Sequence, residues 1–399
     1  MFYLVCSFRW LDYYNETDFV SLAPNEIFDG KDYEIDLEGV TEWEGLLGIV
    51  NTVRSLDQAP LIRNLHMRNG ETSVTGGFIV RPFQQFFIVD GCTTTGLIKG
   101  LDGHPFAGGG GICGQECAHN GGSTVISNSY STGVIGYSAG GIAGRELAKH
   151  GGTANITNCH SYGTIEGRIA GGITGRNPGL EGGKIFIKGC YSKGQVLGRW
   201  SGGICGGSAG VSNGHVIVSR SFSSGDIDGQ QSGGIAGAWA GSMKGALVIK
   251  NCYSAGNLNG ENCGGIVGGV AGHTNGYVLI RNVYSSGMMR GLSVGGVIGS
   301  VDGNDPGEVV VQYSVYNGGG TGFISDDSEQ GLDTKNNYNS NNILEIYGKI
   351  YCHPKGCWDK RIWQETPNGY PKLILNKSKA KSPSKEESQF LEQFLMSAN

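Results

Sequence analysis

The side chains best suited to chemistry form a mixed patch of acidic, basic and aromatic residues in the middle of the chain. The patch consists of Glu166, Arg168, Arg199, Trp200, Asp226 and Asp228. Carboxylates beside an arginine can perform general acid or base catalysis, and an indole face can pack against a sugar ring. A solvated face with ordinary ion pairs has the same composition. We favour the solvated face over a catalytic site and keep a glycan-binding patch as the functional alternative.

Two groups of cysteine and histidine residues could act as metal ligands. The first contains Cys113, Cys117 and His119, and the second contains Cys352, His353 and Cys357. Neither group has two cysteines separated by two residues, and structural zinc normally takes four ligands at tighter spacing. We therefore expect packed or loop cysteines, with no metal and no cofactor.

These residues must be positioned by a repeat that returns six times. The first glycine of each Gly-Gly pair recurs every 31 residues, at Gly140, Gly171, Gly202, Gly233, Gly264 and Gly295. A unit of this size cannot bury its own apolar face and must stack on its neighbours. The period therefore predicts one long solenoid in place of several globular domains.

The columns of the repeat predict its cross-section. They are counted here from an origin glycine in each copy: Gly133, Gly163, Gly194, Gly225, Gly256 and Gly287. Apolar residues stand seven and nine positions before the origin, small residues four before, and aromatic residues or His160 three before. Alternation with period two indicates strands, and glycines mark corners. The pattern predicts an all-β, right-handed parallel β-helix with three short strands per coil.

One column is apolar although its neighbours predict that it faces outward. It contains Val125, Phe186, Ile217, Val248, Leu279 and Val310, with Asn155 as the polar exception. Strands that are apolar on both faces are usually covered on both faces. We expect a homo-oligomer that forms through this column, with a trimer preferred. Coverage by a loop or by the chain's own tail is the alternative.

The segments around the repeat predict the domain organisation. Residues 1–44 read as an N-terminal cap with two strands around the Asp29-Gly30 turn, and residues 45–325 read as the solenoid, most regular over 122–307. Residues 326–377 are predicted to form a loop and a C-terminal cap that brings together Trp358, Trp363, Tyr370 and Leu373. Residues 378–399 are predicted to form an amphipathic tail helix.

Composition excludes several classes of protein. The 399 residues carry a net charge of −5 and only 16% charged residues, without a basic patch, so a nucleic-acid partner is not expected. We find no apolar run long enough to span a membrane and no signal-peptide pattern. The 11 cysteines fall into repeat columns, which favours reduced thiols and synthesis in a reducing compartment.

The segment NCYSAGNLNGENCGGIVGG resembles the GLUG repeat of bacterial surface and adhesin-like proteins. The resemblance covers roughly residues 90–320, and the later W…NGYPKL segment is similar to the ends of such repeat regions. It implies a β-helical scaffold and a surface or adhesin role. Because no export pattern is found, a virion-type component is a further analogy.

Parallel β-helices also include polysaccharide lyases, hydrolases and epimerases. A polygalacturonase-like site requires several motifs in a set order, whereas this chain offers only Asp102-Gly103-His104 and Asp326-Asp327, in the wrong order. We therefore predict no catalytic residues. The favoured function is a non-catalytic, self-associating structural or binding protein. A polysaccharide-active enzyme or a glycan-binding adhesin is the alternative.

Overall fold

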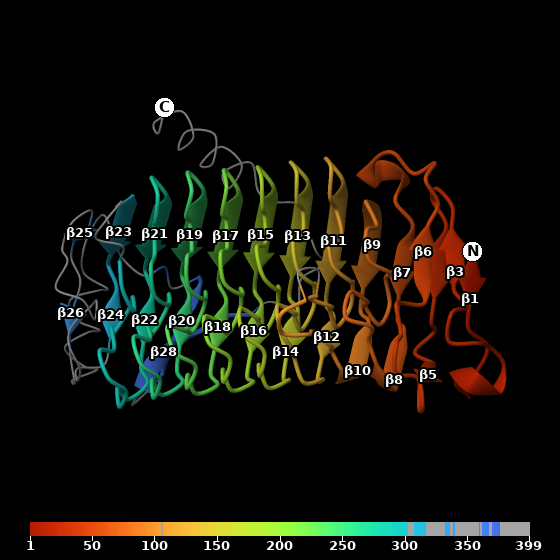
Figure 1. Cartoon of the computed structure of the whole chain (residues 1–399), viewed down its shortest axis with the longest axis horizontal. Coiled ribbons are helices and arrows are strands. Elements are labelled where there is room, and N and C mark those ends of the chain that lie inside the picture. Colours follow the sequence, from red (N-terminus) through yellow and green to blue (C-terminus); the bar gives the residue numbers. More distant parts are fainter. Residues whose placement is uncertain are drawn as a thin grey trace.

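The computed structural model shows a right-handed parallel β-solenoid in the form of a straight rod (Figure 1). It describes residues 1–104, 107–301, 307–316, 332–335, 338–339, 359, 361–366 and 369–375. Two parallel sheets of 12 strands each run along the rod, so the predicted fold class is confirmed. Within the described residues, no helix is long and apolar enough to cross a membrane.

The strands of the first sheet are mostly the longer ones. In spatial order they are β1 (Phe2–Tyr3), β4 (Ile27–Asp29), β7 (Leu61–Arg63), β9 (Phe86–Asp90), β11 (Ser123–Ser127), β13 (Thr153–Thr157), β15 (Lys184–Lys188), β17 (His215–Ser219), β19 (Ala246–Lys250), β21 (Tyr277–Arg281), β23 (Glu308–Gln312) and β25 (Leu332–Lys335). We call this sheet the long-strand sheet.

The second sheet follows the first around a corner of each coil. Its strands are β2 (Phe8–Arg9), β5 (Glu34–Asp36), β8 (His66–Glu71), β10 (Thr93–Leu97), β12 (Tyr130–Ser131), β14 (His160–Ser161), β16 (Tyr191–Ser192), β18 (Phe222–Ser223), β20 (Tyr253–Ser254), β22 (Tyr284–Ser285), β24 (Val315–Tyr316) and β26 (Tyr338–Asn339). Left-handed residues such as Asn128 and Asn158, with φ of 50° and 53°, make the corner between the two sheets.

Isolated parallel bridges complete the remaining sides of the coil. The first glycine of each Gly-Gly motif forms a bridge to its counterpart in the next coil, from Gly110 through Gly140 to Gly295, as the repeat predicted. A second series runs from Ile98 through Ile135 to Met289. Each copy of the motif therefore lies directly above the preceding copy along the axis.

The core is a column of apolar side chains inside the rod. The positions seven and nine before each origin glycine are fully or almost fully buried, as are Cys159 and Cys190 in the small-residue column. Alternation places the intervening residue of each long strand outside. Ile185 and Ile187 thus belong to the main core, whereas Phe186 between them packs in a separate outer cluster.

Coiling begins earlier than the sequence indicated. The two short strands expected around the Asp29-Gly30 turn are β4 and β5, and each pairs in parallel with a strand of the next coil, β7 and β8, so both already belong to the solenoid. Strands β1 and β2 add a further coil before them. A separate pair, β3 (Val20–Leu22) and β6 (Leu47–Ile49), and two short 3₁₀ helices, η1 (Trp10–Asp12) and η2 (Leu56–Gln58), complete this end.

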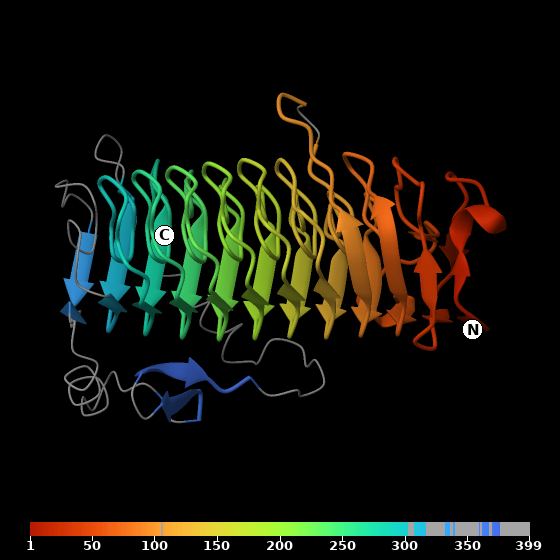
Figure 2. The same cartoon turned by 90° about the horizontal axis from the view of Figure 1, so that it is seen from below.

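At the other end, β25 and β26 extend both sheets into the segment for which a loop was predicted. The antiparallel hairpin of β27 (Trp363–Thr366) and β28 (Gly369–Leu373) then lies along the flank of the rod (Figure 2). Trp363 and Leu373 are buried there, and Tyr370 packs against the same cluster. Trp358 and the predicted tail helix lie outside the described residues.

Candidate functional site

The candidate site lies at a corner of the coil that every repeat makes in the same way. Ile169, Trp200 and Gln231 occupy equivalent positions with φ of 60°, 65° and 54°. Backbone hydrogen bonds join successive corners: the Trp200 amide donates to the Gln230 carbonyl at 2.9 Å, and the Ile169 amide donates to the Arg199 carbonyl at 2.9 Å. Because the backbone is held on both sides, the side chains at this corner project from a rigid support.

Trp200 contacts the guanidinium groups of Arg168, in the preceding coil, and of Arg199, its neighbour in the chain. The Cζ atom of Arg168 lies 4.6 Å from the Trp200 ring centroid, and that of Arg199 lies 4.1 Å from it. These distances are those of cation–π contacts. The indole nitrogen donates to Oε1 of Gln231 at 2.5 Å, which fixes the ring. Arg199 is exposed, and Trp200 is half-buried.

Two further residues complete this group. Trp239, in a loop of the next coil, packs edge-on against Trp200 with 4.7 Å between ring centroids. Asp102, from an earlier coil, pairs with Arg168 at 3.5 Å. Neither contact was predictable from the repeat, because both residues lie in loops that lack a periodic pattern. We call Asp102, Arg168, Arg199, Trp200 and Trp239 the indole–guanidinium patch.

The acidic residues of the predicted patch have other partners. Asp226 accepts hydrogen bonds from the backbone amide and the side chain of Asn257 at 2.8 and 3.1 Å. Asp228 accepts from the side chains of Asn259, at 2.7 Å, and of Gln195. Glu166 is exposed. These amide contacts form a ladder along the outside of successive coils, and the acid that pairs with Arg168 is Asp102.

The outward apolar column is continuous over four coils. Phe186, Ile217, Val248 and Leu279 are aligned by strand register, and Phe186 and Leu279 pack against the other two. Ile217 and Val248 retain only 3% and 2% exposure, whereas Phe186 and Leu279 are half-buried. Of the remaining predicted members, Val125 and Asn155 are half-buried and Val310 is buried. We call Phe186, Ile217, Val248 and Leu279 the apolar stripe.

A stack of aromatic rings runs along the outside of the second sheet. Tyr130, His160, Tyr191, Phe222, Tyr253 and Tyr284 follow one another with 4.6 to 5.0 Å between ring centroids. Tyr370 of β28 continues the stack at 5.0 Å from Tyr284. Burial, and to a lesser degree the Lys193 ammonium, lowers the pKa of His160 to about 4. The imidazole is therefore neutral in the stack at neutral pH.

The cysteines considered as metal ligands have packing partners. Cys113 and Cys117 are fully buried, and the thiol of Cys117 donates to the Arg81 carbonyl at 3.5 Å. Burial raises the pKa of the Cys113 thiol well above its usual range. In the described part of the chain, no three His, Cys, Asp or Glu side chains gather as a metal site would require. Cys352, His353 and Cys357 lie outside the described residues.

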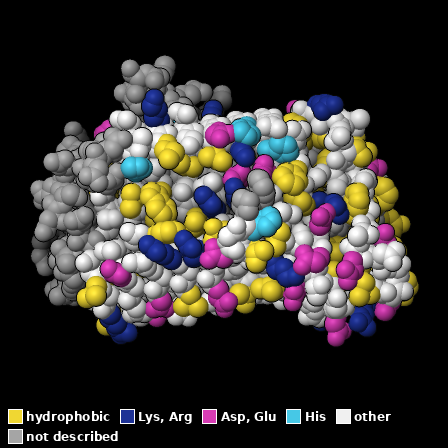
Figure 3. Space-filling view, viewed as in Figure 1, with side chains coloured by type: hydrophobic (Ala, Val, Ile, Leu, Met, Phe, Trp, Pro, Cys, Tyr) yellow, Lys and Arg dark blue, Asp and Glu magenta, His cyan; other side chains and the backbone are white. Residues whose placement is uncertain are grey.

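The visible face of the rod carries interspersed acidic and basic side chains between groups of hydrophobic ones (Figure 3).

No family model and no curated protein sequence matches the chain. Among solved structures, one described as "a putative immunoglobulin A1 protease from Bacteroides ovatus" is similar over 88% of this chain and 77% of its own, with 20% identity and a TM-score of 0.31. This likeness is too distant to carry an argument about function.

Proposed function

We propose that the protein is a non-catalytic structural and binding rod that recognises acidic glycans through the indole–guanidinium patch. The observation that carries the proposal is the contact of the Trp200 ring with two guanidinium groups on a rigid corner. An indole offers an apolar face to a sugar ring, and a guanidinium group binds carboxylate or sulfate in a bidentate manner. The resemblance to GLUG repeats, and with it a surface or virion-type location, belongs to this proposal.

The charges of the patch favour an acidic ligand. Asp102 offsets the charge of Arg168, whereas Arg199 is exposed and forms no ion pair with any described residue. A lyase or hydrolase would use free carboxylates at the patch, whereas the carboxylate of Asp102 is paired with Arg168. Asp226 and Asp228 are held by amides of neighbouring coils, which supports binding without catalysis.

Binding to an immobilised polyuronate, with neutral dextran as reference, tests the proposal. Arg199→Gln should weaken polyuronate binding about tenfold or more, because it removes the exposed guanidinium group. Arg290→Gln is the matched control, since Arg290 is an exposed arginine on another coil. Equal binding by wild type and Arg199→Gln would contradict the proposal. Release of unsaturated or reducing sugar ends from the polymer would instead favour the enzymatic alternative.

Self-association through the apolar stripe is a second candidate function, and a trimer of rods is its preferred form. The observation in its favour is the line of apolar side chains outside the long-strand sheet, where Phe186 and Leu279 keep part of their surface. A partner chain that packed there would bury these two side chains.

The mass of the protein in solution tests this second candidate. Phe186→Lys with Leu279→Lys should convert an oligomer to a monomer, because two charges would enter the interface. Thr157→Lys with Gln312→Lys introduces the same charges one column away, on β13 and β23 of the same sheet, and should leave the mass unchanged. A wild-type protein that is monomeric at high concentration would exclude self-association.

A further inference from the structure

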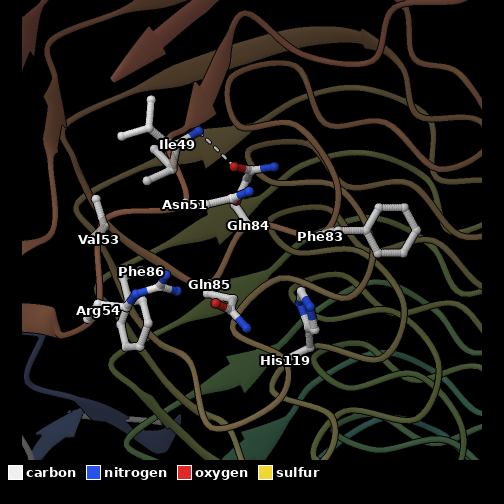
Figure 4. A pocket seen from close by; sticks show the side chains of 10 residues that line it. Ile49, Asn51, Val53, Arg54, Phe83, Gln84, Gln85, Phe86 and His119 are labelled. Carbon is white, nitrogen blue, oxygen red and sulfur yellow. Dashed lines mark hydrogen bonds between the residues drawn. The ribbon is translucent and has the colours of Figure 1, made fainter. Parts of the chain in front are cut away.

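A polar pocket near the N-terminal end of the rod lies apart from the indole–guanidinium patch. It has a volume of about 410 Å³ and is formed by the loop after β6, the segment before β9 and the loop before β11. Figure 4 shows the side chains that line it, among them Arg54, Gln85, Phe86 and His119. This volume is near the lower end for small-molecule sites and suits one sugar ring better than a polymer.

The chemistry of the lining points to an anion. None of the ten lining residues is acidic, and Arg54 is the one with a permanent positive charge. Arg54 is exposed, and its guanidinium group forms no ion pair within the described part of the chain. Phe86 adds a half-buried aromatic surface, and Asn51 and Gln85 add amide groups. A ligand with a carboxylate, hydroxyl groups and an apolar ring face would complement all of these.

Hydrogen bonds hold the loops that form the pocket, and other polar groups of the lining residues remain available to a ligand. Gln84 joins two of the loops: its Oε1 accepts from the Ile49 amide at 2.7 Å, and its Nε2 donates to the Pro82 carbonyl at 2.8 Å. Nδ1 of His119 lies 2.8 Å from the Glu116 carbonyl. Because a carbonyl only accepts, Nδ1 carries a proton, and Nε2 is left to bond to a hydroxyl group of a ligand.

The segment that carries Gln85 is also unusual in its backbone. Phe83 has a φ of +64° and 48% exposure, although a bulky side chain rarely adopts the left-handed region. Its ring meets the edge of His119 with 6.4 Å between centroids.

We propose that this pocket binds a single sugar acid. Arg54 pairs with the carboxylate, the side-chain amides of Gln85 and Asn51 and Nε2 of His119 bond to hydroxyl groups, and Phe86 packs against the apolar face of the ring. This site is separate in residues and position from the patch proposed above, so either proposal can fail without the other.

Titration calorimetry of the full chain with sodium D-glucuronate tests the proposal. We expect saturable 1:1 binding that Arg54→Gln and Gln85→Leu each weaken at least tenfold, in variants whose circular dichroism matches wild type. Methyl β-D-glucoside, which lacks the carboxylate, should bind at least tenfold more weakly than glucuronate. Arg199→Gln, which alters only the other patch, should bind glucuronate like wild type.

Three results would overturn the assignment. The first is a lack of saturable glucuronate binding by the wild-type protein, and the second is unchanged affinity in Arg54→Gln. The third is binding of acetate or inorganic phosphate as tightly as glucuronate, because a pocket that recognises the charge alone is not a sugar-acid site.

Discussion

The origin glycines are required by contact between coils. A Cβ atom at position 194 would lie 1.8 Å from the carbonyl oxygen of Gly163, and one at position 225 would lie 1.9 Å from that of Gly194. The sequence allowed two reasons for glycine here, positive φ or close approach. Close approach is the reason at these positions, whereas most left-handed corners use other residues, such as Asn128 and Trp200.

Gly194→Ala should therefore strongly destabilise the rod. The clash is with backbone that is bonded on both sides, so it cannot be relieved by a rotamer change, and we expect a loss of about 3 kcal/mol in the free energy of unfolding. Gly151→Ala is the control, because Gly151 has a φ of +77° and open space around it. It should cost only about 1 kcal/mol. Urea denaturation measures both, and equal losses would contradict the contact explanation.

His160 should make the stability of the rod depend on pH. Its pKa in the folded protein, about 4, is below the usual histidine pKa of 6.5, so the unfolded chain binds more protons between these values. The contribution of the neutral His160 ring to the free energy of unfolding should be fully present above about pH 6.5. It should be lost as the pH decreases towards 4. His160→Phe keeps an aromatic ring at this position, as Phe222 does two coils later, and removes the proton. The free energy of unfolding of wild type and of this variant is measured at pH 7 and at pH 4.5. The difference between the two proteins should change from one pH to the other, and an unchanged difference would exclude the effect.

Only part of the candidate site could be predicted from individual residues. Arg168, Arg199 and Trp200 lie in periodic columns, so their proximity followed from the repeat. Trp239 and Asp102 lie in loops without a common register, and only the structure brings them to Trp200 and Arg168. The pocket around Arg54 was missed for the same reason, because it is built from three loops of the irregular coils.

At the scale of elements, the sequence patterns were correct wherever the period was regular. At the Asp29-Gly30 turn the sequence indicated the two strands but not their pairing, because an Asp-Gly pair between two short apolar runs is typical of a hairpin, and a corner of a parallel coil has the same composition. Strands β25 and β26 form in a polar segment because β23 and β24 present open edges that can impose pairing.

The β27–β28 hairpin depends on contacts with the aromatic stack. Trp363 is 1% exposed and packs near Tyr253 and Tyr284, and the hydroxyl of Tyr284 donates to the Pro371 carbonyl at 2.8 Å. No local pattern predicts this placement, because Trp363 lies far in the sequence from Tyr253 and Tyr284, which it contacts. Val315, the next residue in the aromatic column, is short, and Tyr370 continues the stack in its place.

Trp363→Ala should release the hairpin and leave the rod folded. Loss of a fully buried indole costs about 3–5 kcal/mol, which exceeds what a two-stranded hairpin can supply alone. Hydrogen exchange should accelerate at the amides of β27 and β28 and stay unchanged in β11 to β18. Gln364→Ala, at an exposed position of the same strand, is the matched control. Protection of the hairpin in Trp363→Ala would show that the stack does not hold it.

The whole molecule is a one-dimensional assembly in which each coil bonds to the coil before it and the coil after it. The stacking of neighbouring coils follows from the 31-residue repeat. For this reason the direction of the rod and the core columns could be predicted, whereas the contacts on the flank and in the loops could not. The patch and the pocket lie on different coils and share no residue, so a substitution at one should leave the other unchanged.

Removal of one complete coil should therefore leave a folded, shorter rod. Deletion of residues 194–224 joins Lys193 to Gly225 and places Phe186 beside Val248 and Tyr191 beside Tyr253, so each column remains filled with residues of the same kind. The rod should shorten by about 4.8 Å, keep its β-sheet circular dichroism and unfold cooperatively, but lose polyuronate binding with Arg199 and Trp200. Deletion of residues 194–208 removes about half a coil, shifts every later column against its neighbour and should prevent folding. If both deletions unfold the chain, the coils are not interchangeable units; if both fold, register between coils is not what specifies the structure.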